Sequence, residues 1–350
     1  MSDNSKQPRR PKQARGSGVS EKKSILPRPA RLNKGRTALD KTEHTIQSKS
    51  RHERVSVDED GQRIDNFLLR RCSGVPRSHI YRLIRKGEVR VDGKKIKQTR
   101  KLCTGEQVRI PALEVKASGQ AVVPDNLAQV IGGAVLFEHE DFLVLNKPPG
   151  IAVHGGSGLA FGLIDGLRQH RHEPKLELAH RLDRATSGCL LVGRSLKATR
   201  ELQNLFRGRT ITKRYVALVD GVWPEELVTI DAPLLKNVES AGQRRVVVHS
   251  SGQSAITHFS VRHRYERATL VDVDLETGRT HQIRVHARHA GHAVVGDLRY
   301  GDNKRNKEFK NLGLNRLFLH SLSLEFQWAG ESYKIEAETG DAWKRALSFL

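Results

Sequence analysis

An aspartate with an arginine on each side marks an unusual stretch of the chain. Asp183 lies in the segment HRLDRATSG, residues 180–188, just before the apolar run Cys189–Val192 that predicts a buried strand. Opposite charges nearby favour the ionised carboxylate, the form that can attack or take a proton. Ion pairs that merely hold a surface loop give the same pattern, and on this pattern alone the structural role is favoured.

Two further segments contain side chains that could assist a carboxylate. Tyr215 begins the apolar run in KRYVALV, residues 213–219, and Arg284 lies in ETGRTHQIRVH, residues 276–286. A phenol can transfer a proton, and an arginine can pair with a carboxylate. Each also has a simpler interpretation, because Tyr215 could be plain core and Arg284 could pair across a helix surface.

Sequence motifs for cofactors and metals are missing. Gly156-Ser157-Gly158 is followed by Phe161 where a dinucleotide fingerprint needs glycine, so it predicts a flexible loop, and no GxxxxGK[ST] occurs. Four histidines have no zinc-type spacing and are expected to be polar or RNA-facing: His281, His286, His289 and His292. We therefore expect neither a cofactor nor a metal.

Positive charge is concentrated in the first third of the chain. The formal net charge is +22 and the pI about 10.2, which predicts a polyanionic partner. Residues 1–54 hold 15 Lys and Arg against 5 Asp and Glu and show no apolar periodicity, so we expect a disordered basic arm. Residues 55–111 hold 14 basic and 7 acidic residues. RNA affinity should therefore depend mainly on the first third.

Residues 55–111 predict a small α+β module. Ile64, Phe67 and Leu68 indicate one helix, and a second helix is followed by Gly87, where a left-handed cap is expected. An Asp92-Gly93 turn then joins two strands. Basic side chains that lie largely off the apolar stripe of the second helix are candidates for RNA binding: Arg77, Arg82, Arg85 and Lys86. Residues 112–132 are predicted to be a linker.

Residues 133–350 predict a larger α+β domain, a mixed, mostly antiparallel sheet with flanking helices. Helices are expected at Lys197–Arg207 and Thr280–His289. Strands are expected at Val135–Glu138, Phe142–Asn146, Cys189–Gly193, Tyr215–Asp220, Leu270–Leu275 and Leu317–Phe326.

Three separated cysteines and the lack of a long apolar run indicate a reduced compartment and no membrane span. We expect a cytoplasmic location. An organellar transit peptide is the weaker alternative, because Asp3 is acidic and no amphipathic helix is evident.

Two family resemblances cover the chain from about Val55 to its end. RIDNFL (63–68), GVPRSHIYRLIRKGEVRVDGKKIK (74–97) and GEQVRIP (105–111) resemble the S4 RNA-binding domain. The HRLD, KRYVALV and GRTHQIR segments resemble the pseudouridine synthases that modify large-subunit ribosomal RNA. NKPPGIAVHGGSG (146–158), APLLKN (232–237) and GLNRLFLH (313–320) resemble the C-type members of this family. The basic arm has no counterpart in the resemblance.

The resemblance implies a pseudouridine synthase fold and a role for each motif residue. Asp183 acts on the nucleoside, Arg284 pairs with this carboxylate, and Tyr215 stacks beside the uracil and serves proton transfer. Arg181 takes the place of the flipped base or clamps a phosphate. Arg279 and His281 are expected on the RNA-binding side.

The implied substrate is 23S ribosomal RNA or its large-subunit precursor, at several uridines near the peptidyl-transferase region, and the implied state is a monomer without a cofactor. Two alternatives remain open. One is a non-catalytic ribosome-binding protein, which would not need Asp183, and the other is a related enzyme that acts on tRNA.

Overall fold

A computed structural model describes residues 45–350 except 73–74, 117–122, 156–158 and 241–242. The first 44 residues of the predicted arm and the predicted loop at Gly156–Gly158 lie outside the described residues. No helix within the described ranges is both long and apolar enough to cross a membrane.

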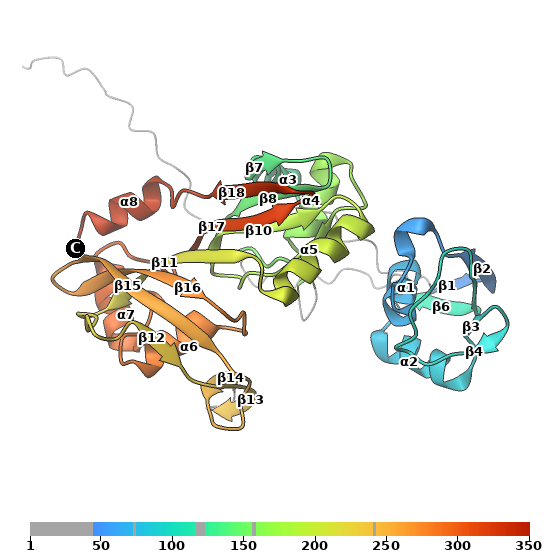
Figure 1. Ribbon diagram of the computed structural model, residues 1–350, viewed down its shortest axis with the longest axis horizontal. Helices are drawn as coiled ribbons and strands as arrows, with labels where there is room; N and C mark the ends of the chain where they lie inside the picture. Colours follow the sequence, from blue (N-terminus) through green and yellow to red (C-terminus); the bar gives the residue numbers. More distant parts are fainter. Residues whose placement is uncertain (1–44, 73–74, 117–122, 156–158, 241–242) are drawn as a thin grey trace, which may run out of the picture. The chain divides into compact units, whose positions relative to one another are not determined.

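A small α+β module forms the first described part of the chain (Figure 1). Its four-stranded sheet has the order β2-β5-β3-β4, and a second pair joins β1 to β6. Phe67 and Ile80 are among the side chains that the two α-helices bury in a common core. The elements are β1 (Thr45–Ser48), β2 (Arg51–Arg54), the 3-10 turn η1 (Val57–Glu59), α1 (Ile64–Arg71), α2 (Arg77–Lys86), β3 (Arg90–Val91), β4 (Lys94–Lys95), β5 (Gln107–Ile110) and β6 (Leu113–Lys116).

The turns of this module follow the predicted backbone conformations. Gly87 ends α2 at φ 75° and donates to the carbonyl of Ile84. Asp92 and Gly93 both have positive φ, 46° and 74°, in the tight turn between β3 and β4. A left-handed helix cap and a two-residue hairpin were both expected here, and both are confirmed.

The prediction that residues 45–54 are disordered is wrong. Residues 51–54 form β2, which pairs antiparallel with β5, and residues 45–48 form β1, which pairs with β6. Arg51, His52, Glu53 and Arg54 are all charged or polar, so the strand has no apolar alternation to reveal it. Pairing with β5 supplies the hydrogen bonds that the composition does not indicate.

The larger domain is built on one ten-stranded sheet, which confirms the predicted fold class. In the described residues its neighbouring strands pair antiparallel, except β10 (Ser187–Gly193) and β17 (Leu319–Trp328), which pair parallel. The main path runs in the order β12 (Thr229–Asp231), β15 (Ile256–Arg264), β16 (Ala268–Leu275), β11 (Thr212–Asp220), β17 (Leu319–Trp328), β10 (Ser187–Gly193), β8 (Phe142–Lys147) and β7 (Val135–Glu138).

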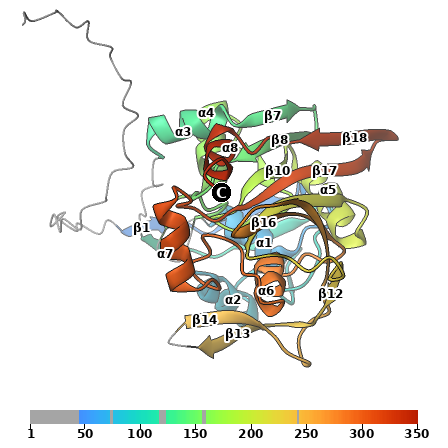
Figure 2. The same ribbon diagram turned by 90° about the vertical axis from the view of Figure 1, so that its left-hand side faces the viewer.

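Three shorter pairings complete the strands of this domain. β18 (Glu331–Glu336) pairs with β17, and β9 (Glu177–Leu178) pairs with β10. β13 (Leu234–Ser240) and β14 (Gln243–Val248) form a separate two-stranded ribbon, visible near α6 in Figure 2. The expected strands from β7 to β17 are present, with ends shifted by up to three residues.

Helices cover the sheet on both faces. Leu167 of α4 and Ile283 of α6 pack in one apolar cluster, whereas Leu202 of α5 and Trp343 of α8 lie in two others. The helices are α3 (Asp125–Gly132), α4 (Leu163–Arg171), α5 (Leu196–Gly208), α6 (Gln282–His289), α7 (Asn303–Asn311) and α8 (Asp341–Leu347).

The predicted linker at residues 112–132 also contains regular structure. Its first part includes β6, and its last part forms α3, whose Ala128 and Ile131 are buried. Ile131 packs in the same cluster as Leu163 and Leu167 of α4. The small polar residues around Pro124 predicted a loop, and packing against α4 stabilises a helix instead.

Candidate active site

Asp183 lies in the loop that leads into β10, near the centre of the sheet. Its carbonyl accepts from the N–H of Thr186 at 3.1 Å, which closes a tight turn before the strand. Gly188 then pairs with Ser321 of β17 in the parallel register. The carboxylate is partly accessible, with 21% of its side chain exposed.

A buried lysine binds backbone carbonyl groups of this loop and of the segment after β8. Lys147 at the end of β8 is fully buried, and its Nζ donates to the carbonyls of Pro148, Ile151 and Arg184, at 2.8, 2.8 and 3.1 Å. Burial lowers the pKa of Lys147 to about 7. Because Arg184 follows Asp183 directly, Lys147 restrains the backbone beside the carboxylate.

Arg284 of α6 links Asp183 to a second, buried aspartate. Its Nη1 donates to Asp183 Oδ2 at 2.9 Å, while its Nε and Nη2 donate to Asp297 at 2.7 and 2.8 Å. Burial opposes the charge, but the ion pairs with Asp297 and Asp183 raise the pKa of Arg284 above its ordinary range. A charge-assisted bond of this kind orients the Asp183 carboxylate.

Asp297 is the inner anchor of this chain of ion pairs. Its side chain has no exposed surface, and it also accepts from the backbone N–H groups of Arg299 and Tyr300, at 2.9 and 3.1 Å. Burial alone would raise its pKa, yet the bonds from Arg284 and from these two N–H groups lower the pKa of Asp297. The carboxylate therefore stays ionised in the interior.

Tyr215 belongs to the buried face of β11. Its side chain is 8% exposed. It packs in the same apolar cluster as Leu182 of the Asp183 loop and Ile283 of α6. Burial raises the pKa of Tyr215 to about 12, and the nearby Asp183 carboxylate contributes to the rise. The hydroxyl is therefore protonated throughout the physiological pH range.

His281 and Tyr300 complete the surroundings of Asp183. The Nε2 of His281 lies 3.6 Å from Asp183 Oδ2, and its Nδ1 lies 2.7 Å from the hydroxyl of Tyr300. The guanidinium of Arg284 stacks over the Tyr300 ring, 5.1 Å from its centroid. Arg284 and His281 thus lie beside a carboxylate about 100 positions earlier in the sequence, and Tyr300 contacts both of them.

The other residues proposed from the sequence have different environments. Arg181 is exposed beside the Asp183 loop, whereas Arg279 donates from its Nε to the carbonyl of Ser254 at 3.0 Å. His286 of α6 is fully buried, and its ring nitrogens bond to the hydroxyl of Thr257 and the carbonyl of Ala232. Of the two environments expected for it, polar or RNA-facing, it has the polar one.

Three residues of this site could not be identified from the sequence. Lys147 and Tyr300 lie in segments without an unusual charge pattern, and the separation of 13 positions between Arg284 and Asp297 matches no helical or strand spacing. The segment NKPPG, which contains Lys147, is distinguished by its family resemblance alone. Within the described ranges, no group of three or more His, Cys, Asp or Glu side chains is placed to hold a metal ion.

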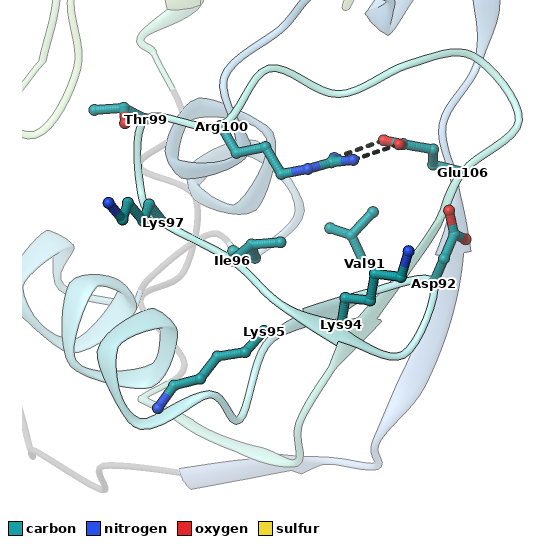
Figure 3. Close-up of a pocket in the computed structure, with 9 residues that line it drawn as sticks. All are labelled: Val91, Asp92, Lys94, Lys95, Ile96, Lys97, Thr99, Arg100 and Glu106. Atoms are coloured by element: carbon teal, nitrogen blue, oxygen red, sulfur yellow. Dashed lines mark hydrogen bonds and ion pairs between the residues drawn. The ribbon is translucent and has the colours of Figure 1, made fainter.

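The candidate RNA-binding side chains of the small module are accessible. Arg77, Arg82, Arg85 and Lys86 are all exposed on α2. An open hollow of about 520 Å³ lies along the segment from Val91 to Arg100 (Figure 3). Arg100 is bonded to Glu106 in its wall, while other cations of its rim are exposed: Lys94, Lys95 and Lys97. The module therefore presents a basic surface of helix and hairpin.

Known proteins resemble both parts of the chain. Residues 141–289 match the RNA pseudouridylate synthase family, and residues 62–108 match the S4 domain. Ribosomal large subunit pseudouridine synthase C of Yersinia pestis is 48% identical over 301 residues, which cover 85% of this chain and 94% of the relative. Its counterpart in Escherichia coli K12 is also 48% identical, over 303 residues and 95% of its length.

Solved structures agree with these matches. Human RNA pseudouridylate synthase domain containing 4 superimposes with a TM-score of 0.54 at 25% identity, covering 64% of this chain and 95% of that one. The human domain-containing 1 protein gives 0.51 at 28% identity, covering 59% and 82%. The chain therefore belongs to the ribosomal large subunit pseudouridine synthase C family and is an RNA-modifying isomerase.

Proposed function

We propose that this protein converts several uridines of 23S ribosomal RNA, near the peptidyl-transferase region, into pseudouridine. The names of its relatives support large-subunit RNA as the substrate. The observation that carries the proposal is the ion pair of Asp183 with Arg284, which is anchored in turn by the buried Asp297. It provides one oriented carboxylate inside a domain of the RNA pseudouridylate synthase family.

The reaction breaks the bond between N1 of the base and C1′ of the ribose, turns the base, and rejoins it through C5. The proton on C5 is lost and N1 gains a proton, so the product is an isomer and no electrons are exchanged. A stacked uridine must first leave the helix, at a cost of a few kcal/mol. We assign to Arg181, which is exposed near Asp183, the role of occupying the vacated position or of holding a phosphate.

Asp183 acts directly on the nucleoside in this scheme. It either adds covalently to the base or the sugar, or stabilises a sugar intermediate and removes a proton from C2′. Arg284 orients it, and the protonated hydroxyl of Tyr215 serves the proton transfer at C5 while its ring stacks on the uracil. Arg279 and His281 lie on the segment that leads into α6 and contribute to the RNA-facing side.

The small module supplies most of the RNA affinity through the exposed cations of α2. We take the module as residues 45–116, because β1 and β2 pair with its strands β6 and β5, and the catalytic domain as residues 125–350, because Ile131 of α3 packs in its core. A monomer acting on the large-subunit precursor in the cytoplasm accounts for these features.

Mapping of pseudouridines tests the proposal. Carbodiimide modification followed by primer extension would be applied to 23S RNA and tRNA from cells that lack the gene. The same cells would be complemented with the wild-type protein or with Asp183→Asn. We expect several 23S positions to disappear on deletion and to return with the wild-type protein alone. Loss of positions only in tRNA, or restoration by Asp183→Asn, would contradict the proposal.

A further inference from the structure

His281 occupies a restrained position between Asp183 and Tyr300. It caps the N-terminus of α6 with φ 58°, a left-handed conformation that residues other than glycine seldom adopt. Backbone of this kind is strained and persists where the surroundings impose it. Here the imposed conformation brings the imidazole to the carboxylate.

The hydrogen bonds of Tyr300 favour one of the two neutral tautomers of His281. The hydroxyl of Tyr300 accepts from the backbone N–H of Val246 at 3.2 Å. Its single proton is then available for His281 Nδ1, 2.7 Å away. An Nδ1 that accepts a hydrogen bond is unprotonated, so the neutral ring carries its proton on Nε2. That N–H faces Asp183 Oδ2 across 3.6 Å.

The same arrangement opposes a second proton on the ring. A proton on Nδ1 would displace the hydroxyl proton of Tyr300 from its acceptor. Four charged groups surround His281. Asp183 comes from the loop before β10, Arg284 from the helix that His281 caps, and Asp297 and Arg299 from the segment just before Tyr300. Burial, together with Arg284 and Arg299, lowers the pKa of His281 although the two aspartates raise it.

We propose that His281 is a positioning residue for Asp183, held by Tyr300 as a neutral imidazole with its proton on Nε2. Arg284 already donates a charge-assisted hydrogen bond to this carboxylate. A second charge at His281 would stabilise the carboxylate further and weaken it as a nucleophile or base, whereas a neutral N–H orients it without that penalty. The distance of 3.6 Å shortens to a hydrogen bond when the substrate encloses the site, as is common for catalytic contacts.

The tautomer can be measured without any assay of activity. Imidazole ¹⁵N NMR of the histidine-labelled protein, with the His281 signals assigned from their loss in His281→Gln, should show the neutral Nε2–H form at pH 7. Tyr300→Phe keeps the ring beneath Arg284 but removes the hydroxyl, and it should give a mixture of tautomers. A wild-type Nδ1–H form, or an unchanged tautomer in Tyr300→Phe, would overturn the proposal.

The rate test rests on the proposed function and uses single-turnover kinetics on pre-folded RNA. At pH 8, His281→Gln, whose amide can still donate to Asp183, should stay within about threefold of the wild type, and His281→Ala should lose about tenfold or more. The loss of rate that accompanies protonation of His281 at low pH should be absent in His281→Gln and shifted to higher pH in Tyr300→Phe.

Matched controls are available at the end of β15 and just after it. His263→Gln is an exposed substitution of the same kind, and Tyr265→Phe removes a hydroxyl remote from Asp183; both should reproduce the wild-type rate and pH profile. Equal rates for His281→Gln and His281→Ala, or identical acid limbs in all variants, would refute the positioning role. A failure of the proposed function is distinct, because it would leave the NMR result unchanged while the wild type formed no pseudouridine.

Discussion

Two carboxylates share one guanidinium at the centre of this protein, and they differ in accessibility. Asp297 has no exposed surface, whereas 21% of the Asp183 side chain is exposed. The buried partner balances most of the charge of Arg284 inside the domain. The outer carboxylate is then oriented by a strong hydrogen bond and still retains the charge that its chemistry needs.

Arg284→Leu should destabilise the fold as well as the site. It leaves Asp297 buried without its partner, so the free energy of unfolding at pH 7 should fall by about 3–5 kcal/mol. In the wild type the pKa of Asp297 is lowered, so the ion pair stabilises the folded state at pH values above the ordinary pKa of aspartate. This contribution to the free energy of unfolding is lost as the pH falls through the lowered pKa of Asp297.

The difference between wild type and Arg284→Leu should accordingly shrink as the pH falls below about 4. Urea unfolding between pH 3 and 8 would measure it. Arg284→Lys, which keeps the charge but cannot make bidentate bonds, should lose less. A loss for Arg284→Leu below about 1 kcal/mol at pH 7 would show that the buried pair contributes little.

Tyr215→Phe should separate proton transfer from stacking. The ring remains in the apolar cluster, but the hydroxyl, whose pKa burial raises to about 12, is removed. If that hydroxyl serves proton transfer, the single-turnover rate should fall roughly 10²–10⁴-fold while RNA affinity changes little. The RNA dissociation constant and the rate should be measured together, with Tyr265→Phe as the control. A rate within threefold of the wild type would exclude the role.

The residues of this site could be predicted to different degrees. Asp183, Tyr215 and Arg284 lie in short segments whose resemblance to a known family identifies them, although the local charge pattern favoured a structural role for Asp183. Asp297 could not be paired with Arg284 from the sequence, because a loop joins them and loop geometry has no period. The interaction of Tyr300 with His281 likewise depends on tertiary contacts.

At the scale of elements, the close approach of β10 and β17 positions the Asp183 loop. Gly188 adopts φ 106°, and a Cβ added there would lie 2.1 Å from the carbonyl oxygen of Ser321. Only glycine allows the two parallel strands to approach this closely. The site therefore depends on a backbone contact five residues beyond Asp183.

Gly188→Ala should separate these strands and reduce activity. Overpacking costs about 1–3 kcal/mol and the left-handed backbone a similar amount, so we expect a total of roughly 2–6 kcal/mol in the free energy of unfolding. Gly330→Ala is the matched control, because Gly330 has φ 87° but nothing within 4 Å of an added Cβ. Equal losses in the two variants, measured by urea unfolding, would mean that the contact with Ser321 is unimportant.

The elements that the sequence failed to reveal share one physical cause. β2 is a charged strand stabilised by its pairing with β5, and α3 is a short helix stabilised by packing on α4. Tertiary contacts supply much of the stability of both elements, and β2 has no apolar alternation of its own. The helices α1 and α2 were predicted because their apolar residues recur at helical spacing.

At the scale of the whole molecule, affinity and chemistry are assigned to different parts of the chain. Residues 1–111 carry +17 of the formal +22 charge, and the exposed arginines of α2 belong to this part. Arg82 and Arg85 make no ion pair with any residue in the described part of the chain, so their charges are available to phosphates.

The double variant Arg82→Gln and Arg85→Gln should weaken RNA binding without slowing the chemical step at saturating enzyme. The log–log slope of affinity against salt should flatten by roughly 0.9 for each duplex phosphate that the variant no longer neutralises. The matched variant Arg82→Lys and Arg85→Lys keeps both charges and should retain the slope. Filter binding would measure the dissociation constant of each variant at salt concentrations between roughly 50 and 300 mM, and so the slope. An unchanged slope would place the sites of phosphate binding elsewhere.

The most direct test of the account is tritium release from RNA labelled at C5 of uridine by purified Asp183→Asn. The substitution preserves the size of the side chain but removes the charge that Arg284 orients, and Asp231→Asn on the exposed β12 serves as the control. We predict no tritium release from Asp183→Asn, with wild-type folding and RNA affinity, and full release from the control. Tritium release by Asp183→Asn at even about a hundredth of the wild-type rate would contradict the assignment of Asp183 as the catalytic residue. Such a rate would mean that the substitution raises the activation free energy by only about 2.7 kcal/mol.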